Sequence, residues 1–263
     1  VVSATGDVTL TNDTNDLAEV AGNVTVAGKF FKYTDANAVS IDAVAAAGAL
    51  SGPSGDAALP GAATAGITTK GDAGGVVVVN TLGTGTLTVA EAILTTPAAG
   101  AGTAGGSVTL ESGGAITLSG NGTITSTGAA NTTGVGGAGG EVFLSSTGAG
   151  AITLGKTITA AGGSAAGGGT TGGAGGVVTL ENDDGAILLS AGGIDVSGGA
   201  SGSVAAGNGG TVQLSTAGTN SAITQSGETS ATAIVGTGAT GGSLAVVSAT
   251  GDVTLTNDTN DLA

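Results

Sequence analysis

Short runs of alternating apolar and polar residues recur along the middle of the chain. The clearest set reads Ser-Val-Thr-Leu from Ser107, Ala-Ile-Thr-Leu from Ala115 and Thr-Ile-Thr-Ser from Thr123, followed by a Gly-rich stretch. Neighbouring side chains of a β-strand point to opposite faces, so each run predicts a short strand with apolar residues inward and threonines outward. The pattern predicts three short strands and a loop in each unit.

These units recur at nearly constant spacing, and each begins with a Gly-Gly dipeptide. The dipeptides start at Gly74, Gly105, Gly139, Gly175, Gly209 and Gly241, so that successive residue numbers differ by 31, 34, 36, 34 and 32. Matched apolar positions recur from unit to unit, as in a solenoid whose coils stack on one another. The predicted inward residues are Val108, Leu110, Ile116, Leu118, Ile124, Val142, Leu144, Ile152, Leu154, Ile158, Val178, Leu180, Ile187, Leu189, Ile194 and Val196. This register places Ile116, Ile152 and Ile187 above one another.

An all-β parallel solenoid is the fold that this repeat favours. Dense glycine, abundant β-branched residues and a period of two argue against helices. A sandwich or barrel does not explain why the same three-strand order recurs. Residues 19–73 are less regular: they hold strand candidates at 23–27 and 38–44, and we count them as one coil with a loop insertion at 48–73. About seven coils are therefore expected in each block of the repeat described next.

The first eighteen residues, VVSATGDVTLTNDTNDLA, return unchanged as residues 246–263. We therefore interpret residues 1–245 as one complete solenoid block of a tandem array and residues 246–263 as the start of the next identical block. The two copies are expected to occupy the same place in the coil, seven coils or roughly 34 Å apart at ~4.8 Å per coil. The chain has no Met, so we expect an internal or processed piece, with targeting signals elsewhere.

Composition restricts both the residue types that can form the core and the classes of partner that the chain can bind. With 55 glycines, three Phe, one Tyr and no Trp, the core must be narrow and built from Val, Ile, Leu and Ala. Nineteen acids against four Lys or Arg residues give a net charge of −15, which disfavours nucleic acid and anionic membranes. The longest apolar run, at 43–50, falls short of the roughly 20 residues of a membrane span. We expect no nucleic-acid partner and no membrane insertion within this chain.

Catalytic and cofactor motifs are sparse. The absence of His and Cys excludes Ser-His-Asp and Cys-His catalysis, disulfides and most zinc sites. The carboxylates of residues 181–184 (Glu-Asn-Asp-Asp) are the best acid–base candidate, but a polar turn between strands is the favoured interpretation. Residues 134–139 match GxGxxG but lead into a strand, which argues against dinucleotide binding. We assign no catalytic residue, no cofactor and no metal ligand, and we do not expect an enzyme.

Three further patterns leave alternatives open. Residues 11–16 (Thr-Asn-Asp-Thr-Asn-Asp) gather oxygen ligands that suit calcium, but Asx turns are the favoured interpretation, and calcium binding around Asn12 to Asp16 stays open. Outward pairs at 123/125 and 157/159 suggest a threonine array for ice binding, but Asp195 and Ser197 interrupt it. The Gly-rich loops could stack like polyproline II helices and let neighbouring shafts associate.

Several motifs resemble those of a known group of proteins. Gly-Asp-Val-Thr-Leu-Thr at 6–11, Asn-Asp-Leu at 15–17, Tyr-Thr-Asp-Ala-Asn-Ala-Val at 33–39 and the GGxVTL…GAITL pattern are similar to the repeats of filamentous-haemagglutinin-like exoproteins. The resemblance is one of repeat texture and covers nearly the whole chain. It implies a right-handed parallel β-helix, export often through an outer-membrane partner, and a role as an adhesin shaft or bacterial cell-surface fibre. Long Gly-rich loops and the perfect recurrence of the block depart from it.

From these patterns we expect an extracellular structural fibre or shaft of a giant tandem-repeat surface protein. It would act through length, stiffness and lateral or surface contact, and its main partner would be itself, by end-to-end continuation of blocks. The alternative is a carbohydrate- or surface-binding adhesin module whose contacts come from the 48–73 insertion.

Overall fold

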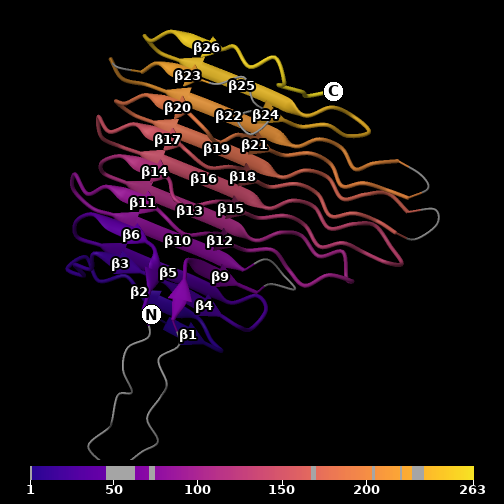
Figure 1. The fold of residues 1–263 in the computed structure, drawn as a ribbon, viewed down its shortest axis with the longest axis horizontal. Helices are drawn as coiled ribbons and strands as arrows, with labels where there is room; N and C mark the ends of the chain where they lie inside the picture. The colour runs from indigo at the N-terminus through magenta and orange to yellow at the C-terminus, as the bar shows by residue number, and fades with distance from the viewer. Residues whose placement is uncertain are drawn as a thin grey trace, which may run out of the picture.

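The chain winds into a stack of coils built from β-strands alone (Figure 1). The structure, a computed structural model, describes residues 2–45, 63–70, 75–166, 170–202, 205–219, 221–226 and 234–263. These residues form 26 strands, and none of them is helical. Three parallel sheets of eight strands each, here called A, B and C, make the sides of the coils. The predicted all-β parallel β-helix is therefore confirmed.

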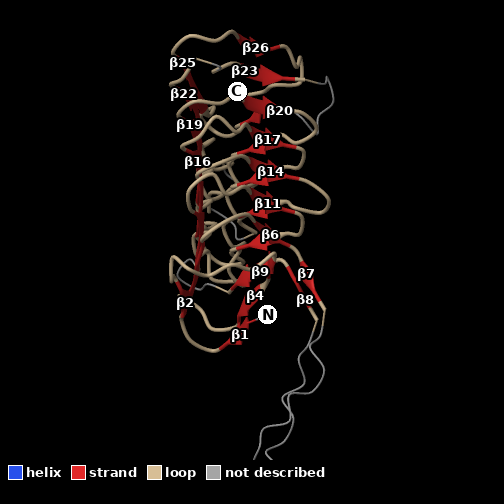
Figure 2. Ribbon diagram, turned by 90° about the vertical axis from the view of Figure 1, so that its left-hand side faces the viewer, coloured by secondary structure: helices blue, strands red, loops and turns tan. Residues whose placement is uncertain are grey.

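Each coil passes through sheet B, then C, then A, and every strand pairs with its counterparts in the neighbouring coils (Figure 2). Sheet A contains β1 (Val2–Ala4), β4 (Gly22–Val24), β9 (Ile67–Thr69), β12 (Ile93–Leu94), β15 (Ile124–Thr125), β18 (Ile158–Thr159), β21 (Ile194–Asp195) and β24 (Ile234–Val235). Sheet B contains β2 (Val8–Leu10), β5 (Phe30–Asp35), β10 (Val76–Thr81), β13 (Ser107–Ser112), β16 (Glu141–Ser146), β19 (Val177–Asn182), β22 (Thr211–Thr216) and β25 (Ser243–Ser248). Sheet C contains β3 (Glu19–Val20), β6 (Val39–Ile41), β11 (Leu87–Val89), β14 (Ile116–Leu118), β17 (Ile152–Leu154), β20 (Ile187–Leu189), β23 (Ile223–Gln225) and β26 (Val253–Leu255). A small antiparallel pair, β7 (Ala43–Val44) with β8 (Thr64–Ala65), lies beside the stack.

The core is a set of apolar columns that run along the axis. All sixteen residues predicted to point inward are buried, at no more than 1% exposure each. Ile116 pairs with Ile152 and Ile152 with Ile187, so the predicted column of isoleucines is confirmed. The aromatic Phe31 and Tyr33 enter the same core from β5. Because similar side chains stack on each other, one narrow core of mainly aliphatic residues runs through the coils.

The irregular region at 19–73 is wound differently from our expectation of one coil. Strands β3 and β4 complete the first coil, and β5, β6 and β9 form most of the second. Phe31 pairs with Val77 in the next coil, so the second coil is longer than the regular ones and accommodates the insertion. Val8 pairs with Phe31, so the first coil is shorter than the regular ones. The single-coil count was therefore wrong, since this region contributes to two coils.

The two identical copies also lie in different sheets, contrary to prediction. Residues Val8–Leu10 form β2 of sheet B, whereas their repeats Val253–Leu255 form β26 of sheet C. The second copy continues β25, whose preceding residues Ser243 to Ala245 already pair with β22. The first copy instead pairs with β5, which belongs to the next coil. The strands next to each copy decide its pairing, so the same eighteen-residue segment occupies two different places in the coil.

Candidate functional site

A buried column of polar side chains runs through the corner between sheets B and C. It occupies the last position of each long sheet B strand, where the alternation points inward. In register the column reads Asp35, Thr81, Ser112, Ser146, Asn182, Thr216 and Ser248. The first six are at most 3% exposed. A polar group at such depth requires a hydrogen-bond partner, and the corner turns provide it.

The polar column bonds the carbonyl groups of the turns between sheets B and C. Ser146 Oγ lies 3.2 Å from the carbonyl oxygen of Gly150. Asn182 Nδ2 donates to Gly150 at 2.9 Å, while its Oδ1 accepts from Gly185 N at 2.7 Å. Similar bonds recur in neighbouring coils, where Ser112 Oγ donates to Gly85 at 2.7 Å. These contacts hold the turns in place, so the column is structural.

Asp35 is the only charged member of this column within the described residues. Its carboxylate accepts hydrogen bonds from Leu17 N at 3.0 Å, from Asn37 N at 2.9 Å and from the Tyr33 hydroxyl. Burial, and after it the hydrogen bond to Asp35, raises the pKa of Tyr33 above its ordinary value of 10.0. Three donors satisfy this carboxylate, and one of them, Leu17 N, ties the first copy's turn to β5. Our sequence analysis missed this site, although continuing the alternation from Phe31 and Tyr33 would have placed Asp35 inward.

The Gly-Gly dipeptides mark the place where sheet A returns to sheet B. The second glycine donates to the sheet A end of the preceding coil: Gly140 N to Ser126 at 2.7 Å and Gly176 N to Ala160 at 2.7 Å. A Cβ on Gly139, the first glycine of its pair, would lie 1.9 Å from the Ala160 carbonyl oxygen. Contacts this short with backbone exclude any side chain. The dipeptide is needed for close approach of the chain.

The Gly-rich loops stack into a second hydrogen-bonded layer beside the coils, here called the glycine slab (Figure 1). It comprises residues 127–139, 161–166, 170–175, 197–202 and 205–209. One series of bonds crosses it: Gly163 N to Gly137 O at 2.7 Å, Gly173 N to Gly163 O at 2.8 Å and Gly199 N to Gly173 O at 2.7 Å. A Cβ on Gly173 would lie 1.8 Å from the Gly137 oxygen. None of the slab's described glycines has a positive φ, so at Gly173 packing distance, and not backbone conformation, requires glycine.

The remaining sequence candidates fall on turns and strands. The GxGxxG match at 134–139 lies in the glycine slab and leads into β16, as predicted. In the acidic group, Asn182 points inward, whereas Glu181, Asp183 and Asp184 are exposed. Asp184 Oδ1 accepts from Thr219 N at 3.4 Å, a contact between two turns. The carboxylates at 181–184 therefore line a solvated turn rather than a cleft.

The calcium candidate forms an Asx turn in both copies of the repeated segment. Asn12 Oδ1 accepts from Thr14 N at 3.0 Å and from Thr14 Oγ1 at 2.8 Å. In the second copy Asn257 Oδ1 accepts from Thr259 N at 2.9 Å and from Thr259 Oγ1 at 2.6 Å. Across the described ranges, no three acidic, His or Cys side chains gather in a way that could hold a metal ion. The residues therefore fit the turn better than they fit a cation.

The threonine array is interrupted in the structure as it is in the sequence. Thr125 pairs with Thr159, but Thr159 pairs with Asp195, which ends the outward column of threonines in sheet A. The 48–73 insertion lies largely outside the described residues, which resume at 63. Its described part includes β8, β9 and Lys70.

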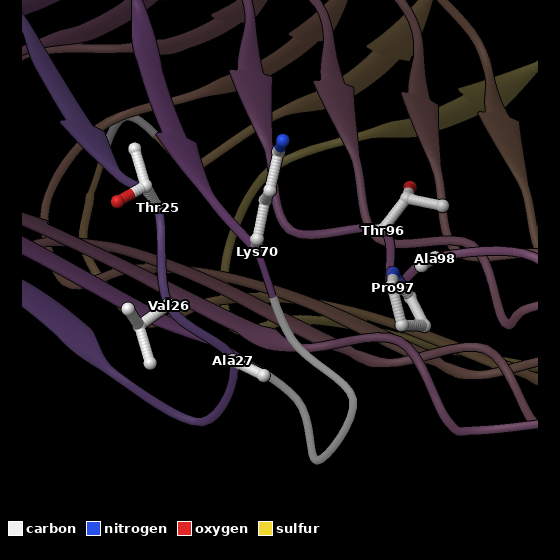
Figure 3. Close-up of a pocket in the computed structure, with 7 residues that line it drawn as sticks. All are labelled: Thr25, Val26, Ala27, Lys70, Thr96, Pro97 and Ala98. Carbon is white, nitrogen blue, oxygen red and sulfur yellow. The ribbon is translucent and has the colours of Figure 1, made fainter. Parts of the chain in front are cut away.

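A surface hollow of about 480 Å³ opens where sheet A turns toward sheet B (Figure 3). It is lined by Thr25, Val26, Ala27, Lys70, Thr96, Pro97 and Ala98. These residues follow β4, β9 and β12, so three successive coils form it. Lys70 is the only ionisable side chain in the described lining. A hollow of this chemistry can hold a small polar molecule, and its described lining offers no acid–base pair.

Comparison with protein-family models, with curated proteins and with solved structures gives no match. Over the described ranges, no helix is long and apolar enough to span a membrane. The geometry of the chain itself is therefore the basis for a function.

Proposed function

We propose that the chain is a segment of an extracellular structural fibre, the shaft of a giant tandem-repeat surface protein. It acts through length, stiffness and lateral or surface contact. The observation that carries the proposal is the unbroken stacking of coils on apolar columns, together with the unchanged return of residues 1–18 at 246–263. A repeat that stacks on itself can extend without limit.

Stiffness follows from the number of contacts that each pair of coils shares. Neighbouring coils are bonded along three sheets, along the polar column and, in the Gly-rich coils, along the glycine slab. Bending the stack would stretch bonds on at least one side, because the three sheets face different directions. A parallel stack of this kind also leaves unpaired edges only at its two ends.

The surface chemistry supports a structural role on the outside of a cell. Nineteen acids against four lysines keep the surface hydrated and repel other acidic polymers. Bacterial cell-surface location and adhesin character rest on the resemblance to filamentous-haemagglutinin-like repeats. A catalytic role is not part of the proposal, since the ionisable groups of the described residues do not converge on a cleft.

The test is the length of proteins with two, four and eight blocks. For a continuous shaft, small-angle scattering and negative-stain microscopy should show rods whose length grows linearly, by about 34 Å per block for seven coils. Matched proteins with a flexible Gly-Ser linker between blocks serve as the control, because their end-to-end distance should grow more slowly than linearly. Rods that bend at every block boundary like the linker controls would contradict the proposal.

A binding role for the insertion is the second candidate, and the hollow in Figure 3 favours it. Lys70 belongs to the insertion and projects beside the threonine side chains of the neighbouring coils. The strong negative charge of the chain points to a neutral sugar rather than an acidic one. Titration with neutral oligosaccharides should then show binding that Lys70→Ala weakens and that Lys156→Ala, in a different coil, does not.

A further inference from the structure

In the last described coil, which contains β25 and β26, apolar core residues are only partly covered. Leu244 and Val246 of β25 and Leu255 of β26 pack against the core but are only partly buried. The β22 residues that pair with Leu244 and Val246, Val212 and Leu214, are 0% and 1% exposed. The alternation along β25 is the same as in β22, and only the depth differs. β25 therefore has the side-chain pattern of an interior strand, and its outer edge is open for pairing with another strand.

We propose that this edge accepts a second copy of the block, whose Phe30–Asp35 strand pairs with β25 and closes a junction coil of regular length. The inference rests on the proposed function and specifies how its blocks join. In a tandem array the second block's Tyr33 follows Val246 at a sequence separation of 32 (33 plus 245 minus 246). The same separation is 31 between Val79 and Leu110 (110 minus 79) and 36 between Leu144 and Leu180 (180 minus 144). The junction coil therefore falls within the range of the regular coils.

The columns of sheet B continue with residues of their own class in this register. The apolar column through Leu214 and Val246 passes to the second block's Tyr33. The polar column through Thr216 and Ser248 passes to its Asp35, a position already buried and hydrogen-bonded in the first block. In sheet C, β26 takes the place that β3 has beside β6. In sheet B the join therefore creates no mismatch between apolar and polar layers.

The first copy shows the competing register. There Leu10 pairs with Tyr33, which gives a sequence separation of only 23 (33 minus 10). Carried into an array, that register would pair Leu255 with the second block's Tyr33 and stretch the preceding coil, counted from Leu214, to a separation of 41 (255 minus 214). It would also remove β25 from sheet B, where its whole length pairs with β22. The repeated segment thus has two registers, a first-copy register, in which residues 8–10 pair with β5, and a junction register, in which residues 246–248 pair with β22.

Engineered disulfides in a two-block protein distinguish the registers, because the chain has no cysteine of its own. Neighbouring parallel strands are ~4.8 Å apart, within the Cα separation that a disulfide spans. One variant combines Ala245→Cys with cysteine at the second block's equivalent of Lys32, an outward pair in the junction register. The other combines Thr254→Cys with that same position, which reproduces the Thr9 to Lys32 pairing of the first-copy register. A Phe143→Cys, Thr179→Cys variant is the positive control, since these outward residues pair within the block.

Mass spectrometry after mild oxidation should find the Ala245 crosslink formed as fully as the control and the Thr254 crosslink lost. A Thr254 crosslink without the Ala245 one would overturn the register, while rods of full length would still uphold the shaft. If neither crosslink forms and scattering shows two articulated bodies, both the register and the stiff shaft are wrong. The control crosslink verifies that each protein has folded.

Discussion

Replacement of Ile152 by Asp tests the apolar column where it is most regular. Ile152 is fully buried in β17, between Ile116 of β14 and Ile187 of β20. Loss of the isoleucine side chain alone is worth about 2–5 kcal/mol, as for Ile→Ala in other cores. Among the described residues, no lysine is buried where it could pair with the new carboxylate. The charged form would therefore be desolvated without compensation.

The charge part of this loss depends on pH in a defined direction. An unfolded Asp has a pKa of about 3.9, and burial raises the pKa of the folded one. The charge penalty is therefore absent below about pH 3.9 and grows by about 1.36 kcal/mol per pH unit until the folded pKa is reached. If that pKa reaches about 7, the penalty at pH 7 is about 4 kcal/mol, which brings the total to about 6–9 kcal/mol.

Urea unfolding followed by circular dichroism at pH 4 and pH 7 measures these losses. Ile152→Asn, which is uncharged and of the same size as the Asp variant, should match Ile152→Asp at pH 4 and be clearly more stable at pH 7. Thr153→Asp, on the outward side of the same strand, should change stability by about 0.5 kcal/mol or less. Equal losses for Ile152→Asp and Thr153→Asp would refute the facing of the strand. Parallel behaviour of the Asp and Asn variants across pH would refute the charge argument.

Other parts of the structure give sharper contrasts between paired variants. In the glycine slab, Gly173→Ala should lower the melting temperature because its methyl group meets backbone oxygen, whereas Gly202→Ala, with nothing within 4 Å of its Cβ, should not. Ser146→Ala should cost about 1–3 kcal/mol in chemical unfolding by leaving buried turn carbonyls unpaired, and Ser145→Ala on the outward face should be nearly neutral. Tyr33 is the only tyrosine of the chain, so absorbance at alkaline pH reports it alone. Its raised pKa predicts that tyrosinate appears well above pH ~10 in the folded protein and that stability falls as pH rises past ~10; ionisation at the free value would contradict its burial. Chelation should leave the melting curve unchanged, because the apolar core runs through all the described coils whereas the calcium candidate occurs once per block, and a collapse of the β-signal would contradict this.

Much of this architecture could be predicted from the sequence because a solenoid repeats one local rule. The alternation of apolar and polar residues predicted that Ile116 and Leu118 point inward, and the spacing of the Gly-Gly pairs predicted their partners in the next coil. The coils of the region at 19–73 could not be predicted in this way, because its apolar residues lack a constant spacing. The polar column was missed for a related reason: Ser146 and Asn182 are ordinary turn residues until the register places them in one buried line.

The Gly-rich loops show what repetition alone leaves undecided. Their glycine content left the stacking of the loops as an open alternative, and the structure shows close backbone contacts such as Gly163 with Gly137. Which loop atoms meet is a matter of tertiary structure, since each bond joins residues that are far apart in the chain. The surface hollow at Lys70 is likewise built from three coils, so no short stretch of sequence could reveal it.

The repeated segment shows most clearly what the local sequence determines and what only the tertiary structure determines. Its eighteen residues determine local structure by themselves: Asn12 with Thr14, and Asn257 with Thr259, form the same Asx turn. They do not determine which sheet the flanking strands join. The first copy pairs with β5, whereas the second copy extends β25, which already pairs with β22. The backbone N–H and C=O groups that pair strands are the same in both copies, so each copy pairs with the strand edge that lies nearest to it. Side-chain chemistry specifies the turns and which side chains of a strand point inward, whereas the neighbouring coil decides which sheet the strand joins.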